Sequence, residues 1–299
     1  MRKDWCSMTT PAVENTRETL ACLIIDDPLL RPKYGCLDYK KLLEEMKVHN
    51  FFTEIAFIPW NYKRSDVKTV RLFADNADYY AICMHGCNHT GKEFGGGDYQ
   101  ELSALSATAL WRMEQHKRFT GLPYDPVTVF PQGHFSSVAI QALKDQGYFA
   151  AFNWTFRATD GEELLAVEYQ RPATKIYHDF PLFLRRYPKD KSNFIQDMAS
   201  GRPIIVVEHH GAFRNGYKTM TDLVDWINSL GNVRWTSLLH IAEHYLGEKA
   251  ETTGPSIMPS PPPMLFNWKV ALRRFLSEVR DNHVETSSLL TKAYKMVRG

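Results

Sequence analysis

The stretch YYAICMHGCNHTGKEF, residues 79–94, indicates how this chain folds. Its first part, 79–84, is an apolar run with the length and composition of a buried β-strand. The run stops at His85, and a second histidine, His89, follows four residues later among glycine and small polar residues. Buried strands of parallel sheets are near-continuous apolar runs, so these two histidines stand where such a strand ends.

Strand-like runs alternate with segments of helical spacing along most of the chain. Comparable apolar runs lie at 20–26, 53–60, 126–131, 148–154 and 202–209, and helical patterns lie at 37–49, 66–76, 99–119, 136–147, 190–200 and 220–231. Repetition of this kind predicts parallel βαβ units. The prolines between residues 171 and 183 predict loops and an edge element there.

The number of strands separates two parallel architectures. About seven strand candidates suit an α/β barrel, closed or incompletely closed, better than a minimal doubly wound sheet. We divide the chain into an N-terminal segment (1–19), the barrel (20–247), a linker rich in Pro, Ser and Thr (248–264) and a C-terminal helical extension (265–299). Apolar residues recur at helical spacing in this extension, which predicts docking on the barrel, on a second copy in a homo-oligomer, or on an acidic carrier through the arginines.

Composition and charge exclude several classes of protein. The 299 residues are 44% hydrophobic and 23% charged, as in ordinary globular proteins, and the net charge of +2 is too small for a general nucleic-acid or membrane footprint. Five cysteines, an odd number, predict reduced thiols rather than a disulfide framework. Neither a signal peptide nor an apolar run of about 20 residues is evident, so we expect a cytoplasmic protein without stable membrane insertion.

Polar groups of unusual density follow four of the predicted strands. They are Asp26 and Asp27, His85 and His89, Gln132 and His134, and Glu208 with His209 and His210. In parallel α/β folds the carboxyl ends of all strands open onto one face, where functional groups gather. The sequence therefore predicts a catalytic rim built from these groups.

Two histidines spaced i, i+4 and an aspartate from another strand form a set of two imidazoles and one carboxylate. Such a set leaves positions open for water and substrate, as in hydrolytic zinc sites and in facial-triad iron sites. A zinc protease would need a glutamate after the first histidine, and that residue is Gly86. A zinc knuckle at Cys83 and Cys87 would need a second ligand pair, and the P-C-x-x-C signature of base deaminases does not occur.

Four motifs resemble those of a known family. LIIDDP (23–28), HGCNH (85–89) followed by Thr90, VFPQG (129–133) and IIVVEHHG (204–211) are similar to the first, second, third and fifth motifs of the polysaccharide deacetylases, the NodB-homology proteins of carbohydrate esterase family four. The resemblance spans about residues 20–246. It implies an irregular (β/α)7 barrel of the glycoside hydrolase and deacetylase type. It also implies removal of acetyl groups from N-acetylated sugars with a divalent metal, usually zinc.

The resemblance assigns roles to residues of this chain. It implies that Asp26 is the general base, that Asp27, His85 and His89 are the metal ligands, and that His209, with His210 as the competing choice, is the general acid. The candidates for binding substrate are Pro131, Gln132, Gly133, His134, Trp154 and Arg171.

The chain departs from the family pattern at three points. Pro28 replaces the glycine after the acid pair, Val129 replaces the arginine that opens the third motif, and the aspartate–tryptophan pair of the fourth motif is only loosely matched by Trp154 and Asp160. Arg171 is the candidate for replacing the missing cation, and the sequence leaves open whether the third-motif arginine is replaced at all.

Other functions are compatible with the same barrel. It could hydrolyse a non-sugar amide or a glycosidic bond, or it could bind carbohydrate without catalysis. A cytoplasmic deacetylase would act on nucleotide-linked or lipid-linked sugar precursors rather than on finished polymer.

Overall fold

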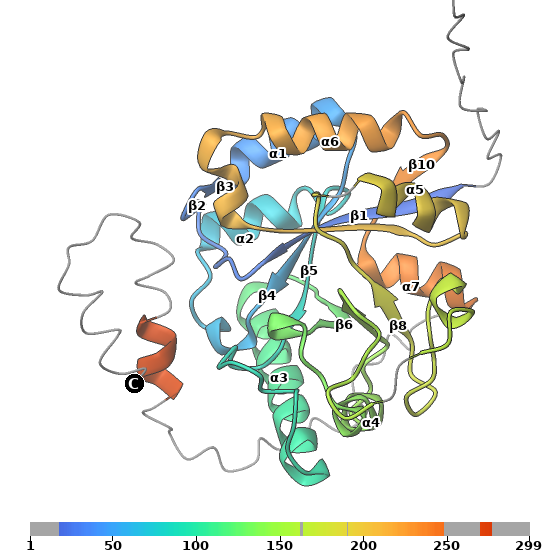
Figure 1. The fold of residues 1–299 in the computed structure, drawn as a ribbon. Helices are drawn as coiled ribbons and strands as arrows, with labels where there is room; N and C mark the ends of the chain where they lie inside the picture. Colours follow the sequence, from blue (N-terminus) through green and yellow to red (C-terminus); the bar gives the residue numbers. More distant parts are fainter. Residues whose placement is uncertain (1–17, 162–163, 190, 248–269, 277–299) are drawn as a thin grey trace, which may run out of the picture.

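The computed structural model describes residues 18–161, 164–189, 191–247 and 270–276. Their architecture is a nearly closed barrel of seven parallel strands surrounded by helices (Figure 1). The barrel strands are β1 (Thr19–Asp26), β4 (Thr53–Phe57), β5 (Tyr80–His85), β6 (Asp125–Val129), β7 (Ala150–Asn153), β8 (Leu182–Leu184) and β9 (Ile204–His209). The predicted α/β barrel is confirmed.

β1 lies between two other strands of the ring. Residues Leu23–Asp26 pair with β4, and residues Ala21–Asp26 pair with β9. The ring closes after β8, where the backbone N–H of Arg186 donates to the carbonyl of Ile205 at 2.8 Å and its carbonyl accepts from Val207 at 2.9 Å. The segment expected to hold an edge element thus contributes a strand that leads to this closure.

Helices and short elements connect the strands. The helices are α1 (Tyr39–His49), α2 (Val67–Ala74), α3 (Tyr99–Thr120), α4 (Ser137–Asp145), α5 (Lys191–Ala199), α6 (Lys218–Asn228) and α7 (Leu238–Leu246). The short elements are the hairpin β2 (Lys33–Tyr34) and β3 (Leu37–Asp38), the strand β10 (Val233–Trp235), and the 3-10 turns η1 (Pro59–Asn61), η2 (Pro131–Gly133), η3 (Glu168–Gln170) and η4 (His210–Asn215). Each helical pattern and each apolar run of the sequence corresponds to one of these elements.

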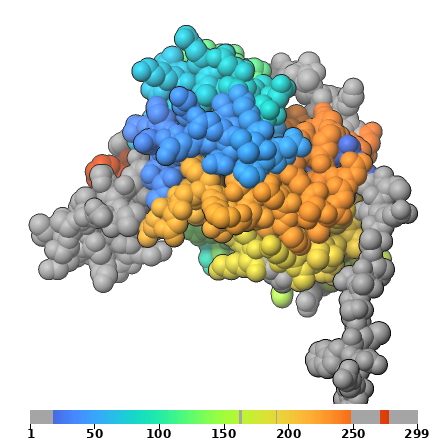
Figure 2. Space-filling view, turned by 90° about the horizontal axis from the view of Figure 1, so that it is seen from above, coloured from blue at the N-terminus to red at the C-terminus, as the bar shows by residue number. Residues whose placement is uncertain are grey.

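Local sequence explains where several helices begin. Asp38, Asp66 and Asp98 stand directly before α1, α2 and α3, and each carboxylate accepts one or two hydrogen bonds from backbone N–H groups of the first helical turn. α1 and α6 lie side by side on the outside of the barrel, as their blue and orange surfaces show (Figure 2). The side-chain amide of Asn228 joins them by donating to the carbonyl of His49 at 2.9 Å.

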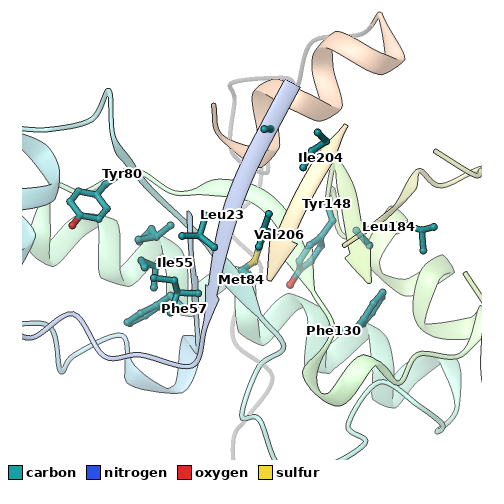
Figure 3. Close-up of a cluster of buried hydrophobic side chains, with 14 of the residues drawn as sticks. Leu23, Ile55, Phe57, Tyr80, Met84, Phe130, Tyr148, Leu184, Ile204 and Val206 are labelled. Carbon is teal, nitrogen blue, oxygen red and sulfur yellow. The ribbon is translucent and has the colours of Figure 1, made fainter. Parts of the chain in front are cut away.

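Alternate residues of the barrel strands belong to two separate apolar clusters. The outer cluster includes Leu23, Ile55 and Met84 together with helix residues such as Leu42 and Phe73, so it lies between the strands and the helices (Figure 3). The inner cluster contains the strand residues that alternate with those of the outer cluster. Its strand members are Leu20, Cys22, Ile24, Ala56, Cys83, Val127, Val129, Ala150, Phe152, Phe183, Ile205 and Val207.

The inner cluster also contains Leu238, Ile241 and Ala242 of α7. This helix closes the end of the barrel at which the strands begin. Its N-terminus is capped by two acids of that end, because the backbone N–H of Leu238 donates to Glu54 at 2.8 Å and that of Leu239 donates to Asp125 at 3.1 Å. Burial raises the pKa of Asp125 to about 6.

Three other sequence expectations concern the chain as a whole. No helix in the described ranges is both long and apolar enough to span a membrane. The described cysteines, Cys22, Cys36, Cys83 and Cys87, are free thiols. Residues 270–276 of the predicted C-terminal extension are helical, whereas the predicted linker and the remainder of the extension lie outside the described residues.

The outer cluster makes a prediction about stability. Leu23 is fully buried in it, so Leu23→Ala should lower the free energy of unfolding by about 2–5 kcal/mol, through lost burial and the cavity left behind. Val48→Ala is the control, because this α1 side chain is 75% exposed and its loss should change stability by less than about 0.5 kcal/mol. Chemical denaturation of both variants measures the difference, and equal stabilities would contradict the assigned core.

Candidate metal centre

The carboxyl ends of β1, β5 and β9 bring the predicted site residues together. Asp26 ends β1, His85 ends β5 and His209 ends β9, and Asp26 is the direct register partner of His209. By strand alternation, all three continue the interior face formed below them by Ile24, Cys83 and Val207. The polar rim predicted from the sequence is therefore the last layer of the barrel interior.

Asp27, His85 and His89 form a group that could hold a metal ion. Their ligand atoms all lie within 4.8 Å of one another. Oδ1 of Asp27 is 3.3 Å from Nε2 of His85 and 3.1 Å from Nε2 of His89. This oxygen is buried and has no hydrogen-bond partner among the described groups, although two imidazoles point at it. A carboxylate oxygen left in that state fits a site made for a cation.

A hydrogen bond orients the first of these imidazoles. Nδ1 of His85 lies 3.0 Å from the carbonyl oxygen of Val129, and because a carbonyl can only accept, Nδ1 carries the proton and donates it. This arrangement leaves the Nε2 atom to face Asp27. Metal-binding histidines are commonly fixed in this way through their other nitrogen.

Two of the three candidate ligands have unusual backbone geometry. Asp27 has a φ of 81° and His89 a φ of 56°, both in the left-handed region that residues other than glycine seldom adopt. Gly86 has a φ of 63°, and a Cβ atom there would lie 2.4 Å from the ring of Pro131. Strained backbone of this kind concentrates at functional sites, where neighbouring contacts hold it in place.

The charges of the group shift its pKa values in different directions. Burial raises the pKa of Asp27, but His89, His85 and His209 outweigh burial and hold that pKa well below its usual range. Burial lowers the pKa of His85, yet Asp26 and Asp27 raise it to a net value above the usual one. Burial lowers the pKa of His89, and Asp27 offsets this only in part. In the metal-free protein, the imidazolium form of His85 therefore persists to a higher pH than that of His89.

Asp26 has a partner that the sequence did not predict. Nη1 of Arg185 lies 2.8 Å and 2.7 Å from its two carboxylate oxygens, and both side chains are almost fully buried. Arg185 follows β8 directly and also donates to the carbonyl of Phe130 at 3.4 Å. The cation that contacts the Asp26 carboxylate in the described part of the chain is therefore Arg185 and not Arg171. Arg171 itself has a side chain 61% exposed and pairs with Glu168.

The two late histidines differ in what they contact. Nε2 of His209 is 4.0 Å from Oδ2 of Asp27, and its ring stacks parallel to Tyr187 with 6.4 Å between centroids. The ring of His210 packs edge-on against Tyr34 at 5.0 Å and occupies the space where a side chain at Gly35 would stand. His209 therefore faces the candidate metal group, and His210 packs against the loop that follows β1.

A cavity of about 560 Å³ opens over this group. Its lining consists of Asp26, Asp27, His85, His89, Gln132, Gly133, Trp154, Arg185, Tyr187, His209, His210 and Gly211. Trp154 lies directly against Gly133, because a Cβ atom at that glycine would be 1.4 Å from the indole Nε1. With 53% of its surface exposed, the indole is free to stack on a bound molecule.

Other predicted residues stand outside this lining. Among the described residues, Pro131, His134 and Arg171 do not line the cavity. Pro131 packs against Gly86, and His134 lies near Gly95. Asp160 accepts from the backbone N–H and hydroxyl of Ser137 at the start of α4, so its role in the structure is a helix cap.

Sequence reasoning missed Arg185 and Tyr187, which both line the cavity. The available signal was the pair Arg185–Arg186 directly after the short apolar run 182–184. A charged pair that ends an apolar run is the same kind of signal that identified the acids after β1.

One residue of the C-terminal extension influences a candidate ligand electrostatically. Arg274, in the helical residues 270–276, is 4% exposed. Its charge is among the influences that lower the pKa of His89. The extension was expected to pack on the barrel or on another subunit, and that expectation stays a prediction.

Comparisons with known proteins bear on the fold. The chain matches no protein-family model and no curated protein. Among solved structures, it is similar to a protein from Mycobacterium smegmatis designated a polysaccharide deacetylase, with 14% identity, 80% of this chain and 96% of that chain covered, and a TM-score of 0.52.

Two further structures show lower scores. A family 4 carbohydrate esterase from Bacillus anthracis has 15% identity, a coverage of 77% and 85%, and a TM-score of 0.47. A CE4 family pseudoenzyme from the same organism has 13% identity, a coverage of 74% and 68%, and a TM-score of 0.43. With seven parallel strands, surrounding helices and the similarity to the Mycobacterium smegmatis structure, the chain has the (β/α)7 barrel fold of the polysaccharide deacetylases.

Proposed function

We propose that this protein is a metal-dependent hydrolase that removes the acetyl group from the nitrogen of an acetylated amino sugar. One observation carries the proposal. The buried Oδ1 of Asp27, which has no hydrogen-bond partner among the described groups, faces Nε2 of both His85 and His89 within 3.3 Å. A second carboxylate, Asp26, stands beside this group and is held by Arg185.

Asp27, His85 and His89 would hold the metal. Two imidazoles and one carboxylate suit zinc and leave positions open for water and substrate. Once bound there, zinc would polarise the acyl oxygen and lower the pKa of water to about 7.

Asp26 is the proposed general base. It lies beside the ligands, with Oδ2 at 3.9 Å from Nε2 of His85, and so can accept the proton of the attacking water. Arg185 fixes the orientation of this carboxylate through contacts with both oxygens. The pair is almost fully buried, so the carboxylate is presented to the cavity in one position.

His209 is the proposed general acid. Its ring is held by Tyr187 on the side of the cavity that faces Asp27, and its side chain is 45% exposed. A protonated imidazole at this place can donate to the amine nitrogen as the bond to the acyl carbon breaks. Asp26 takes one proton from water and His209 gives one to the amine, so the products are acetate and a free amino sugar.

The proposed substrate class follows from the cavity wall. Trp154 offers an exposed indole face, and aromatic faces of this kind pack against the apolar faces of ligand rings. Gln132 in the same wall can donate and accept hydrogen bonds. An apolar face with polar groups around it suits a sugar ring.

Acetate release tests the proposal. Purified protein is loaded with zinc or stripped by a chelator and incubated with N-acetylated sugars, including nucleotide-linked and lipid-linked forms. We expect the zinc-loaded protein to release acetate and the stripped protein to release none. Cleavage of a glycosidic bond, hydrolysis of non-sugar amides only, or sugar binding without turnover would replace the proposal by one of the other functions compatible with this barrel.

The ligand assignment predicts the effect of removing one histidine. His85→Ala should abolish stoichiometric zinc binding, because two ligands remain of three. His240→Ala is the matched control, since His240 and His244 have the same i, i+4 spacing on α7 but belong to no group of three potential metal ligands within the described ranges. Metal content by elemental analysis distinguishes the two variants. Full zinc occupancy in His85→Ala would refute the assignment.

The two adjacent acids should differ in phenotype. Asp26→Asn should retain zinc and lose about 100-fold to 10,000-fold in kcat, the usual contribution of a general base. Asp27→Asn should lose zinc. Both variants are compared by metal content and by acetate release at saturating substrate. If Asp26→Asn lost zinc and Asp27→Asn kept it, the two roles would have to be exchanged.

Zinc affinity should depend on pH through His85. Its pKa is raised in the metal-free protein, so below that pKa a proton occupies the nitrogen that a metal needs. Affinity should therefore fall as the pH decreases through the raised pKa and level off above it. Competition with a chelator at several pH values between about 5.5 and 8.5 measures this dependence. An affinity independent of pH over this range would contradict it.

A further inference from the structure

The carboxylate of Glu93 accepts hydrogen bonds from the backbone of the turn between His85 and His89. Oε1 of Glu93 accepts from the backbone N–H groups of Cys87 at 2.7 Å and of His89 at 3.0 Å. The N–H group of Asn88 lies between them and is shared by Oε1 at 3.2 Å and Oε2 at 3.1 Å. Three consecutive amides therefore converge on a single side chain, in hydrogen bonds strengthened by its charge.

β5 ends at His85, so the backbone amides that follow are no longer part of the sheet. The turn therefore depends on the Glu93 carboxylate. Gly86 makes room for it, since a Cβ atom at that position would lie 2.2 Å from Oε1 of Glu93. His89, at the far end of the turn, has left-handed backbone with a φ of 56°. A histidine keeps this conformation only where the surrounding contacts favour it.

A buried cation holds the opposite side of the same turn. Arg112 of α3 is 2% exposed, and its Nη1 donates to the carbonyl of Cys87 at 3.1 Å and to the side-chain oxygen of Asn88 at 2.8 Å. Its guanidinium also packs over Trp60, 5.0 Å from the ring centroid. An anion thus faces the N–H groups of the turn and a cation faces its carbonyl side.

We propose that Glu93 is a positioning residue of the metal centre, which fixes His89 in the direction of Asp27. The proposal rests on the metal-dependent function argued above. Glu93 acts on only one of the ligands, because His85 belongs to β5 and is oriented by Val129. Without Glu93, His89 returns to ordinary backbone geometry and its imidazole leaves the group, while His85 and Asp27 stay in place.

Zinc titration of three proteins tests this role. Glu93→Ala should weaken zinc affinity by about 10-fold to 100-fold, as is typical when a residue that supports a ligand is removed. Glu93→Gln should fall between this variant and the wild type, since its amide oxygen can still accept from Cys87 and His89. Glu44→Ala, a glutamate exposed on α1, is the control and should bind zinc as the wild type does.

Two further measurements separate positioning from folding. The absorption spectrum of the cobalt-loaded protein reports the ligand set, and it should change in Glu93→Ala and remain nearly unchanged in Glu93→Gln. Thermal unfolding of the metal-free proteins gives the folded fraction at the temperature of titration. Equal affinities and spectra in all variants, or an affinity loss in Glu93→Ala and Glu93→Gln no larger than the loss of folded protein, would overturn the proposal. Failure of the wild type to bind metal would instead refute the proposed function.

Discussion

Neighbouring residues of a β-strand point to opposite sides of the sheet, yet Asp26 and Asp27 have to serve one cavity. The chain meets this constraint by leaving extended geometry at Asp27, where φ is 81°. Asp26 keeps the alternation of β1 and points into the barrel, and the left-handed residue after it turns the second carboxylate to the histidines. Backbone of this kind costs about 1–3 kcal/mol. The rest of the site is arranged around the turned carboxylate.

Much of this arrangement could be predicted because it follows strand periodicity. The apolar runs indicated where the strands end. Because the carboxyl ends of parallel strands open onto one face, Asp26 and His85 could be expected to lie close together. Arg185 escaped prediction because β8 has three residues, too few to show a period, and follows a proline-containing loop. Glu93 escaped because it acts through backbone amides, and no pattern of side chains reports which carboxylate will accept from a distant turn.

The polar groups described above lie at the two ends of the barrel interior. Between the rim and α7 the interior is apolar and includes small side chains such as Cys22, Ala56 and Cys83. At the rim, the buried pair of Asp26 and Arg185 satisfies two charges at once. Breaking such a pair leaves one charge without compensation, at a cost of about 3–5 kcal/mol. A change at Arg185 would therefore affect folding as well as the carboxylate that it orients.

The position of α7 determines how molecules enter and leave the cavity. Leu238, Ile241 and Ala242 fill the barrel where the strands begin, so the cavity at the other end is a blind pocket rather than a channel. Incoming and outgoing molecules must share one entrance. Under the proposed hydrolase function, the product has to leave before the next substrate enters, so the rate at which the pocket empties limits turnover together with the rate of bond cleavage.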